Sequence, residues 1–466
     1  MVTTEKTLHE KLLQVMDQSK LWEGSQRSTH GFLLSPDVYH VSDEHQNQLE
    51  KLCPALNECL SGFGRLVAIA QTPEFVRTNA YRLINTVANV GAPLYYRDAQ
   101  FRRPSCLPVV CKCDLMDATD GTLKIAEIDG INKHGFGYGA LVNRLRDAIG
   151  DHDPESCYPG IAHTIAQAIN QPKVKYRACP SPDGRYNRRN LPPMVSYTEL
   201  EWCELGLLFG EHERFYLPEF RVFADEMKRY KVKVTMVGER DLKLKEGEVT
   251  NLPSRILVDL PACVRNPQLS ETLAGMYVKG EVDFLLPPKP FLSSKGVMAL
   301  LRNDEHDEDL ECTLRSQISS SALATVRAHL PPTYLVTRRN LGFIRDVLTG
   351  SGTPYVLKAV ISNGMKGTIF MEDSRYETVL AELSKIGDGS YILQEEVVNK
   401  PETFNYFQPD GELRDDTWYK RMIVHFARGL VADIDITARR DKKVHGAKDC
   451  LQLGVIRGYR RTGGVY

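Results

Sequence analysis

The chain has 466 residues, of which 26% are charged and 42% hydrophobic, a composition typical of a globular protein long enough for about three domains. A net charge of −1 gives no overall field that would attract a nucleic acid or an anionic membrane, so we expect neither as a partner. The eleven cysteines are scattered and include no Cys-x-x-Cys pair, which predicts reduced thiols in a cytoplasmic protein. The sequence contains no run of about 18 apolar residues, so we expect no membrane span.

Helical spacing of apolar residues marks the N-terminal segment 1–105, as in Leu49, Leu52, Leu56 and Leu60,. Residues 107–116 and 123–129 then have strand character around a turn at 117–121, which predicts a hairpin. Further on, strands at 205–209, 232–237 and 255–258 alternate with a helix at 218–230, which predicts a small domain with a parallel sheet. The remainder is rich in strands with intervening helices, so the predicted fold class is α/β (α+β).

The predicted hairpin carries three carboxylates, Asp114, Glu127 and Asp129. Residues i and i+2 of a strand share one face, so Glu127 and Asp129 point together and Asp114 can meet them from the partner strand. Such oxygen ligands suit Mg²⁺ that bridges phosphate oxygens; exposed strand carboxylates are the alternative. The glycine-rich stretch that follows, with Asn132 and His134, predicts backbone held close to a ligand. Asn132 and His134 are therefore candidate substrate residues.

Three widely spaced lysines, Lys295, Lys358 and Lys448, each lie in a short polar break beside an apolar run. Phosphates require several positive charges and backbone amides at once, so the set points to a nucleotide, although each lysine alone is typical of a surface. Lys358 is followed by a loop that contains Gly364, Lys366 and Gly367. No Gly-Lys-Ser/Thr opens a helix here, so the loop is not a Walker A motif.

Two further positions are candidates for ligand contacts. The apolar strand 391–393 ends at Gln394 and Glu395, where backbone groups could pair with an adenine edge, or where the strand simply ends. Arg439 has the planar guanidinium that holds a carboxylate or an acyl phosphate, with surface ion pairing as the alternative. Arg265 is a candidate for the substrate cleft of the middle domain.

The order and spacing of these residues resemble the glutathionylspermidine-synthase-like members of the ATP-grasp superfamily, over about residues 107–140 and 285–457. In that family an Asp and a later Glu-x-Asn bind magnesium, and the matching residues are Asp114, Glu127 and Asp129. The other matches are Lys295, Lys358 and Lys448 for the nucleotide lysines, Gln394–Glu395 for the hinge, and Arg439 for an arginine nine residues before the last lysine. Lys112 stands where the family has a phosphate-binding Arg, and Asp129 stands where it has Asn.

The resemblance implies an ATP-grasp fold whose metal-binding hairpin occupies 106–150 and whose nucleotide-binding subdomains occupy 291–466. A small parallel-sheet domain of the pre-ATP-grasp type would occupy 151–290, and the helical segment 1–105 has no counterpart in the family. The implied cofactors are ATP and Mg²⁺, and Arg439 and Lys112 would be catalytic.

The implied reaction is ligation of a small-molecule carboxylate and amine, such as amino acids or peptides, through an acyl phosphate, with release of ADP and phosphate. The alternatives are a ligase that loads a carrier protein, a non-catalytic nucleotide-binding regulatory protein, and a kinase-like phosphotransferase that stops at the phosphorylated product. The sequence leaves open the identity of both substrates and whether the chain forms a homo-oligomer.

Overall fold

The computed structural model describes residues 2–21, 31–72, 78–102, 104, 106–150, 152–170, 201–245, 248–258, 265–350, 352–362, 367–372, 378, 381, 388–446 and 449–458. Parallel and antiparallel sheets occur together with helices, which confirms a mixed α/β protein. None of the helices in these ranges is long and apolar enough to cross a membrane.

The central sheet is antiparallel and has the strand order β17-β16-β15-β2-β3, with β14 paired to β15. Its strands are β2 (Cys111–Asp117), β3 (Leu123–Asp129), β14 (Glu402–Phe407), β15 (Leu413–Ala427), β16 (Leu430–Arg439) and β17 (Leu451–Leu453). Successive strand residues point to opposite faces, and the two faces differ in character. One face carries buried apolar groups such as Cys113, Leu115, Met422, Val424 and Ile436. The other carries charged groups.

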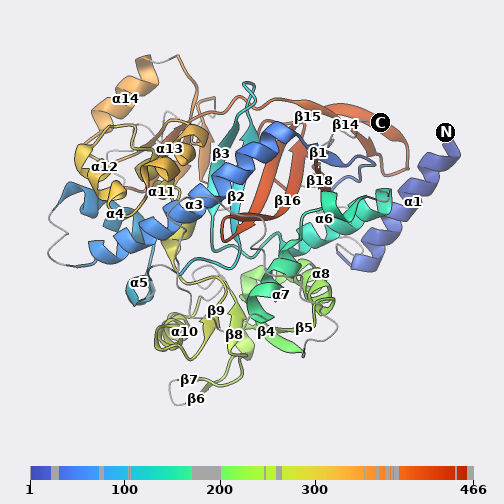
Figure 1. Cartoon of the computed structure of the whole chain (residues 1–466), viewed down its shortest axis with the longest axis horizontal. Helices are drawn as coiled ribbons and strands as arrows, with labels where there is room; N and C mark the ends of the chain where they lie inside the picture. The colour runs from blue at the N-terminus through green and yellow to red at the C-terminus, as the bar shows by residue number, and fades with distance from the viewer. Residues whose placement is uncertain are drawn as a thin grey trace, which may run out of the picture.

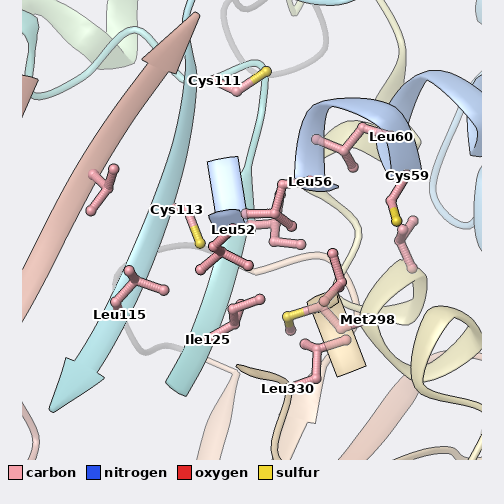
Figure 2. Packing of buried hydrophobic residues seen from close by; sticks show 14 of the residues in the cluster. Leu52, Leu56, Cys59, Leu60, Cys111, Cys113, Leu115, Ile125, Met298 and Leu330 are labelled. Carbon is pink, nitrogen blue, oxygen red and sulfur yellow. The ribbon is translucent and has the colours of Figure 1, made fainter. Parts of the chain in front are cut away.

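Helix α3 (Asp43–Ala70) closes the apolar face of the central sheet. It begins after Ser42, whose hydroxyl accepts a hydrogen bond from the backbone N–H of His45 and so caps the helix,. In Figure 1 the helix runs across β2 and β3, and Figure 2 shows Leu52, Leu56 and Leu60 beside Cys113, Leu115 and Ile125. This face is therefore filled by protein, and ligand chemistry is left to the charged face.

The N-terminal segment is helical, as predicted, with α1 (Val2–Ser19), α3, α4 (Asn79–Asn89) and α5 (Leu94–Arg102). It is also joined to the far end of the chain, because β1 (Tyr39–Val41) pairs in parallel with β18 (Val455–Arg457). The segment thus shares a hydrophobic core with the central sheet.

A second antiparallel sheet has the order β10-β13-β11-β12, formed by β10 (Thr333–Leu335), β11 (Tyr355–Ala359), β12 (Thr368–Phe370) and β13 (Tyr391–Glu395). Helix α14 (Leu341–Gly350) packs against it through Ile344. Lys358 lies in β11 opposite Thr368 and Ile392. The predicted strand around Lys358 and its apolar return strand are therefore confirmed.

A third sheet is parallel, with the order β5-β4-β8-β9, as the alternation of strands and helix predicted. Its elements are β4 (Cys203–Phe209), α8 (Leu217–Lys228), β5 (Val232–Gly238), β8 (Arg255–Leu257), α10 (Pro267–Lys279) and β9 (Asp283–Phe284). In Figure 1 this small domain lies below the central sheet, and α6 (Phe136–Ile149) and α7 (Ile161–Asn170) lie between the two.

The remaining elements are short and connect these sheets. They are the helices α11 (Gly296–Arg302), α12 (Glu308–Arg315) and α13 (Ser320–His329), the strands β6 (Leu244–Lys245) and β7 (Glu248–Val249), and the 3₁₀ helices η1 (Pro154–Ser156), η4 (Glu211–Tyr216), η5 (Glu239–Asp241) and η6 (Pro290–Ser293).

Candidate functional site

The β2–β3 hairpin forms as predicted and places its charged residues side by side. Its register pairs Asp114 with Glu127 and Lys112 with Asp129. Side chains of directly paired residues point to the same face of a sheet. The three predicted carboxylates and Lys112 therefore form one patch on the charged face of the central sheet.

Asp114 is buried within this patch, with 3% of its surface exposed. Its Oδ2 atom lies 3.0 Å from Nη1 of Arg421, and its Oδ1 atom lies 3.8 Å from Nζ of Lys112. Burial alone would raise the pKa of Asp114, but Arg421 and then Lys112 outweigh burial and hold the pKa below its usual value,. Asp114 is thus a carboxylate at neutral pH, and its Oδ1 atom makes no hydrogen bond within the described ranges.

Two predicted nucleotide lysines reach consecutive residues of β3 from different elements. Lys295, next to α11, donates from Nζ to Glu127 Oε1 at 2.7 Å and to the carbonyl of Ser362 at 2.8 Å. Lys358, in β11, donates from Nζ to the carbonyl of Ala126 at 3.2 Å. The lysines therefore converge where the second sheet meets the carboxylate hairpin.

Lys358 is held by Gln394, one of the two predicted hinge residues. The ammonium group donates to Gln394 Oε1 at 2.6 Å, and Gln394 Nε2 in turn donates to the hydroxyl of Thr333 at 3.1 Å. Burial lowers the pKa of Lys358 to about 8, and the nearby Glu127 only partly opposes this effect,. The backbone N–H of Glu395 donates to the carbonyl of Pro332. Pairing of this strand end with a base stays a prediction.

The charges of the patch are unequal. Burial would lower the pKa of Lys112, but Asp114 and Asp129 outweigh burial and raise it. Among the described residues, four cationic side chains lie in or beside this patch of three carboxylates, and they are Lys112, Lys295, Lys358 and Arg421. An excess of positive charge beside partly buried donors favours an anion such as a phosphate.

Asp129 connects the hairpin to the loop that follows it. Its carboxylate accepts hydrogen bonds from the hydroxyl of Ser293 and from Nδ2 of Asn132, the latter at 2.7 Å. The Asn132 side chain also accepts from the backbone N–H of His134 at 2.8 Å. Asn132 and His134, both predicted substrate residues, are therefore linked to the carboxylate patch.

The glycines of this loop have a packing role. A Cβ atom at Gly137 would lie 2.0 Å from the carbonyl oxygen of Glu219, and Gly135 has a φ of +103°. The backbone N–H groups of both glycines donate to Oε1 of Glu219. The glycines hold the start of α6 against α8, and the closeness of this loop to a ligand stays a prediction.

Glu219 gives a testable dependence of stability on pH. Burial is complete and raises its pKa to about 8, although the hydrogen bonds from Gly135 and Gly137 oppose the shift. The folded state then binds one proton more than the unfolded chain between pH 4.5 and 8, so stability is full below pH 4.5 and falls as pH rises through 8. We expect Glu219→Gln, which stays neutral, to be more stable than the natural protein at pH 8.5 by about 5 kcal/mol and similar at pH 5.

The measurement is urea unfolding at pH 5, 7 and 8.5. The matched control is Asp225→Asn, an exposed carboxylate on the same helix, which should leave the pH slope unchanged. A slope for Glu219→Gln equal to that of the natural protein would contradict this assignment.

The fit of Mg²⁺ to the patch is partial. Within the ranges that the structure describes, no group of three or more His, Cys, Asp and Glu side chains is arranged to share a metal ion. Mg²⁺ is commonly held by one or two carboxylates together with phosphates. Asp114, whose Oδ1 atom makes no hydrogen bond within the described residues, and the opposed Glu127, which also accepts from Lys295, fit that need. Asp129 is engaged with Ser293 and Asn132.

Arg439 lies at the end of β16, two strands from the hairpin. Its guanidinium donates to Asp449 Oδ2 at 2.6 Å and to the carbonyl of Lys443 at 2.9 Å, and lies 2.8 Å from Nε2 of His445. Arg265 lies apart as well: its side chain is exposed in the small domain, and its backbone N–H donates to Glu239. The structure does not join either arginine to the carboxylate patch by a contact between described residues.

Gly364, Lys366 and Lys448 lie outside the described residues. Gly367 begins the return to β12, and a Cβ atom there would lie 2.6 Å from that of Ala359. Close packing of the loop base therefore accounts for a glycine at this position.

Arg421 of the site was missed from the sequence. It points to the charged face because it alternates with the buried Met422 on β15, and its neighbour Asp114 is set by the register of β15 against β2. The alternation can be seen in the sequence, but the register cannot. Glu213, which lies 2.9 Å from Nε2 of His134, comes from η4.

No protein-family model matches the sequence, and no curated protein matches it. Among solved structures, the chain is similar to a glutathione synthetase-like effector (GSS30) from Globodera pallida, with 12% identity, a TM-score of 0.53, and coverage of 96% of both chains. A second solved structure, of a protein described as a gamma-glutamylcysteine synthetase from Methylobacillus flagellatus KT, matches with 13% identity and a TM-score of 0.38. The match covers 77% of this chain and 82% of that chain. The chain therefore shares the overall fold of a glutathione synthetase-like protein.

Proposed function

We propose that this protein is an ATP- and Mg²⁺-dependent carboxylate–amine ligase with an ATP-grasp fold. The observation that carries the proposal is the convergence of Lys295 and Lys358, from two separate elements, beside Glu127 on the hairpin. The excess of cationic groups there suits a triphosphate. The fold shared with a glutathione synthetase-like protein supports the same reaction class.

In this proposal the nucleotide lies between the second sheet and the central sheet. Lys295 and Lys358 neutralise its phosphates, while Lys112 and Arg421 lie beside Asp114 on the charged face of the central sheet. Asp114 and Glu127 would hold Mg²⁺, which would supply charge neutralisation for the β- and γ-phosphates. Arg439 stays the predicted anchor of the acid, and Lys448 the third nucleotide lysine.

The reaction would proceed in two steps. An oxygen of the substrate carboxylate attacks the γ-phosphorus, and the bond to ADP breaks with its electron pair on the leaving oxygen. The amine then attacks the acyl carbon, and inorganic phosphate leaves. The protein contributes positioning and charge stabilisation, since no side-chain nucleophile is needed. Water must be excluded because acyl phosphates hydrolyse.

We expect ADP and phosphate to be released only when an acid and an amine are both present. Purified protein with Mg-ATP would be incubated with the twenty amino acids and γ-glutamylcysteine, and products would be followed by ³¹P NMR and mass spectrometry. Release of AMP and pyrophosphate would contradict the ATP-grasp mechanism. A phosphorylated product that accumulates without amide would favour a phosphotransferase.

A further inference from the structure

The groups that contact β3 and its following loop have a definite order along the chain. Lys358 contacts Ala126 and Lys295 contacts the adjacent Glu127. Asp129 follows, then Asn132, and the contacts end at His134, which faces the small parallel-sheet domain through Glu213. His134 therefore comes last in this order, after the carboxylates and farthest along the chain from the contacts of the two lysines. If the lysines bind the phosphates, we expect an acceptor to approach from the His134 end.

The imidazole of His134 is held in one orientation. Its Nε2 atom lies 2.9 Å from Oε1 of Glu213, and its ring lies 3.9 Å from that of Tyr216 and is stacked at 5.6 Å and 19° on that of Phe220 (centroid distances). Glu213 is itself 2% exposed and is fixed by Nζ of Lys133 at 2.7 Å and by the backbone N–H of Gly210 at 2.9 Å. Packing and hydrogen bonds thus leave the ring little freedom.

This arrangement also sets the tautomer of His134. A carboxylate only accepts hydrogen bonds, so the proton lies on Nε2 and the lone pair lies on Nδ1. Nδ1 is buried and makes no hydrogen bond with any described residue. An unpaired buried acceptor is unfavourable in the free protein, and it becomes paired if a bound group donates an N–H to it.

Burial keeps the ring of His134 neutral, against the effect of the nearby carboxylates. Burial lowers its pKa; Glu213 and Asp129 act in the opposite direction, and Lys133 adds to the lowering. A neutral imidazole with a fixed lone pair can accept a proton at neutral pH. Once protonated, it would be stabilised by the carboxylate of Glu213, because that carboxylate contacts the ring directly.

We propose that Nδ1 of His134 accepts the proton of the amine substrate when the amine attacks the acyl phosphate, a role that rests on the proposed ligase function. The new C–N bond forms, the C–O bond to phosphate breaks with its electron pair on the phosphate oxygen, and the surplus proton of the nitrogen passes to Nδ1. Glu213, Tyr216 and Phe220 are positioning residues for this step. The acceptor is accordingly a protonatable amine.

The test separates the two half-reactions. Hydroxylamine, which is largely unprotonated at pH 7, traps acyl phosphates as hydroxamates without a general base. The variant His134→Gln keeps an N–H donor toward Glu213 but cannot accept the proton. With Mg-ATP and the pool of amino acids and γ-glutamylcysteine, we expect amide formation to fall about 10²-fold or more, with hydroxamate formation within threefold of the natural protein. The acidic limb of the pH–rate profile for amide formation should disappear in the variant.

The matched control is His212→Gln, an exposed histidine of the same 3₁₀ helix as Glu213, which should change neither rate. Equal loss of amide and hydroxamate in a folded His134→Gln variant would show that the residue acts on nucleotide or acid binding and would overturn the inference. Retention of both rates would overturn it as well. If the natural protein forms no hydroxamate with any acid of the pool, the ligase function and the inference fail together.

Discussion

Replacing Lys358 with methionine is expected to reduce ATP-dependent turnover by about 10²- to 10³-fold, while the protein becomes slightly more stable. The ammonium group lies beside Glu127 and Ala126, where we place the phosphates, and methionine has similar length but no charge. Burial of the charge lowers the pKa of Lys358 to about 8, which corresponds to a destabilisation of about 3 kcal/mol. Loss of the bonds to Gln394 and Ala126 offsets about 2 kcal/mol of that, which leaves a net gain of about 1 kcal/mol.

The pH dependence gives this prediction a second readout. The folded-state pKa of Lys358 lies below its ordinary value of 10.5, so the folded protein binds fewer protons than the unfolded chain between pH 8 and 10.5. The stability contribution therefore rises with pH across that window and is lost in the methionine variant. Lys233→Met, at an exposed strand lysine, is the control for urea unfolding and for turnover. A fully active Lys358→Met variant would remove Lys358 from the nucleotide site.

Replacing Asp114 with asparagine is expected to reduce Mg²⁺-dependent turnover by about 10³-fold or more. The substitution keeps the shape of the side chain but removes the charge of the carboxylate, whose Oδ1 atom makes no hydrogen bond with any described residue. It also leaves Arg421 without its counterion, so the free energy of unfolding should fall by about 2 kcal/mol. Turnover as a function of Mg²⁺ concentration, together with urea unfolding, measures both effects.

Two further variants serve as a control and as a second test of the metal site. Asp415→Asn, at an exposed position of the same sheet, should change neither quantity. Glu127→Gln tests the opposed carboxylate, in case Asp114→Asn does not fold. Turnover within threefold of the natural protein in both site variants would rule out Asp114 and Glu127 as metal ligands.

Features that depend on local pattern were predictable from the sequence. Alternation along 107–129 gave the hairpin, and with it the pairing of Asp114 with Glu127. The strand that contains Lys358 and the parallel sheet of the small domain followed from the same reasoning. In each case the signal lies within a short window, where the period of apolar residues decides the structure.

Features that depend on long-range register were not predictable. Arg421 meets Asp114 because β15 pairs with β2 across some three hundred residues of sequence, and nothing local fixes that register,. The packing of Gly137 on Glu219 could not be foreseen either, because a glycine that approaches another helix looks the same in sequence as one that approaches a ligand. The partner of Arg439 was not predictable either: its guanidinium was expected to bind the carboxylate of a substrate, and in the structure it donates to a carboxylate of the chain itself, Asp449.

In the proposed mechanism a carboxylate is activated by the γ-phosphate of ATP, and oxygen transfer tests that step most directly. The pool of amino acids and γ-glutamylcysteine would carry ¹⁸O in its carboxyl groups, and the inorganic phosphate released with Mg-ATP would be analysed by mass spectrometry. We predict one ¹⁸O atom in the phosphate for each amide formed, and ADP as the nucleotide product. Amide formation with label in AMP, or with unlabelled phosphate, would contradict the acyl-phosphate mechanism.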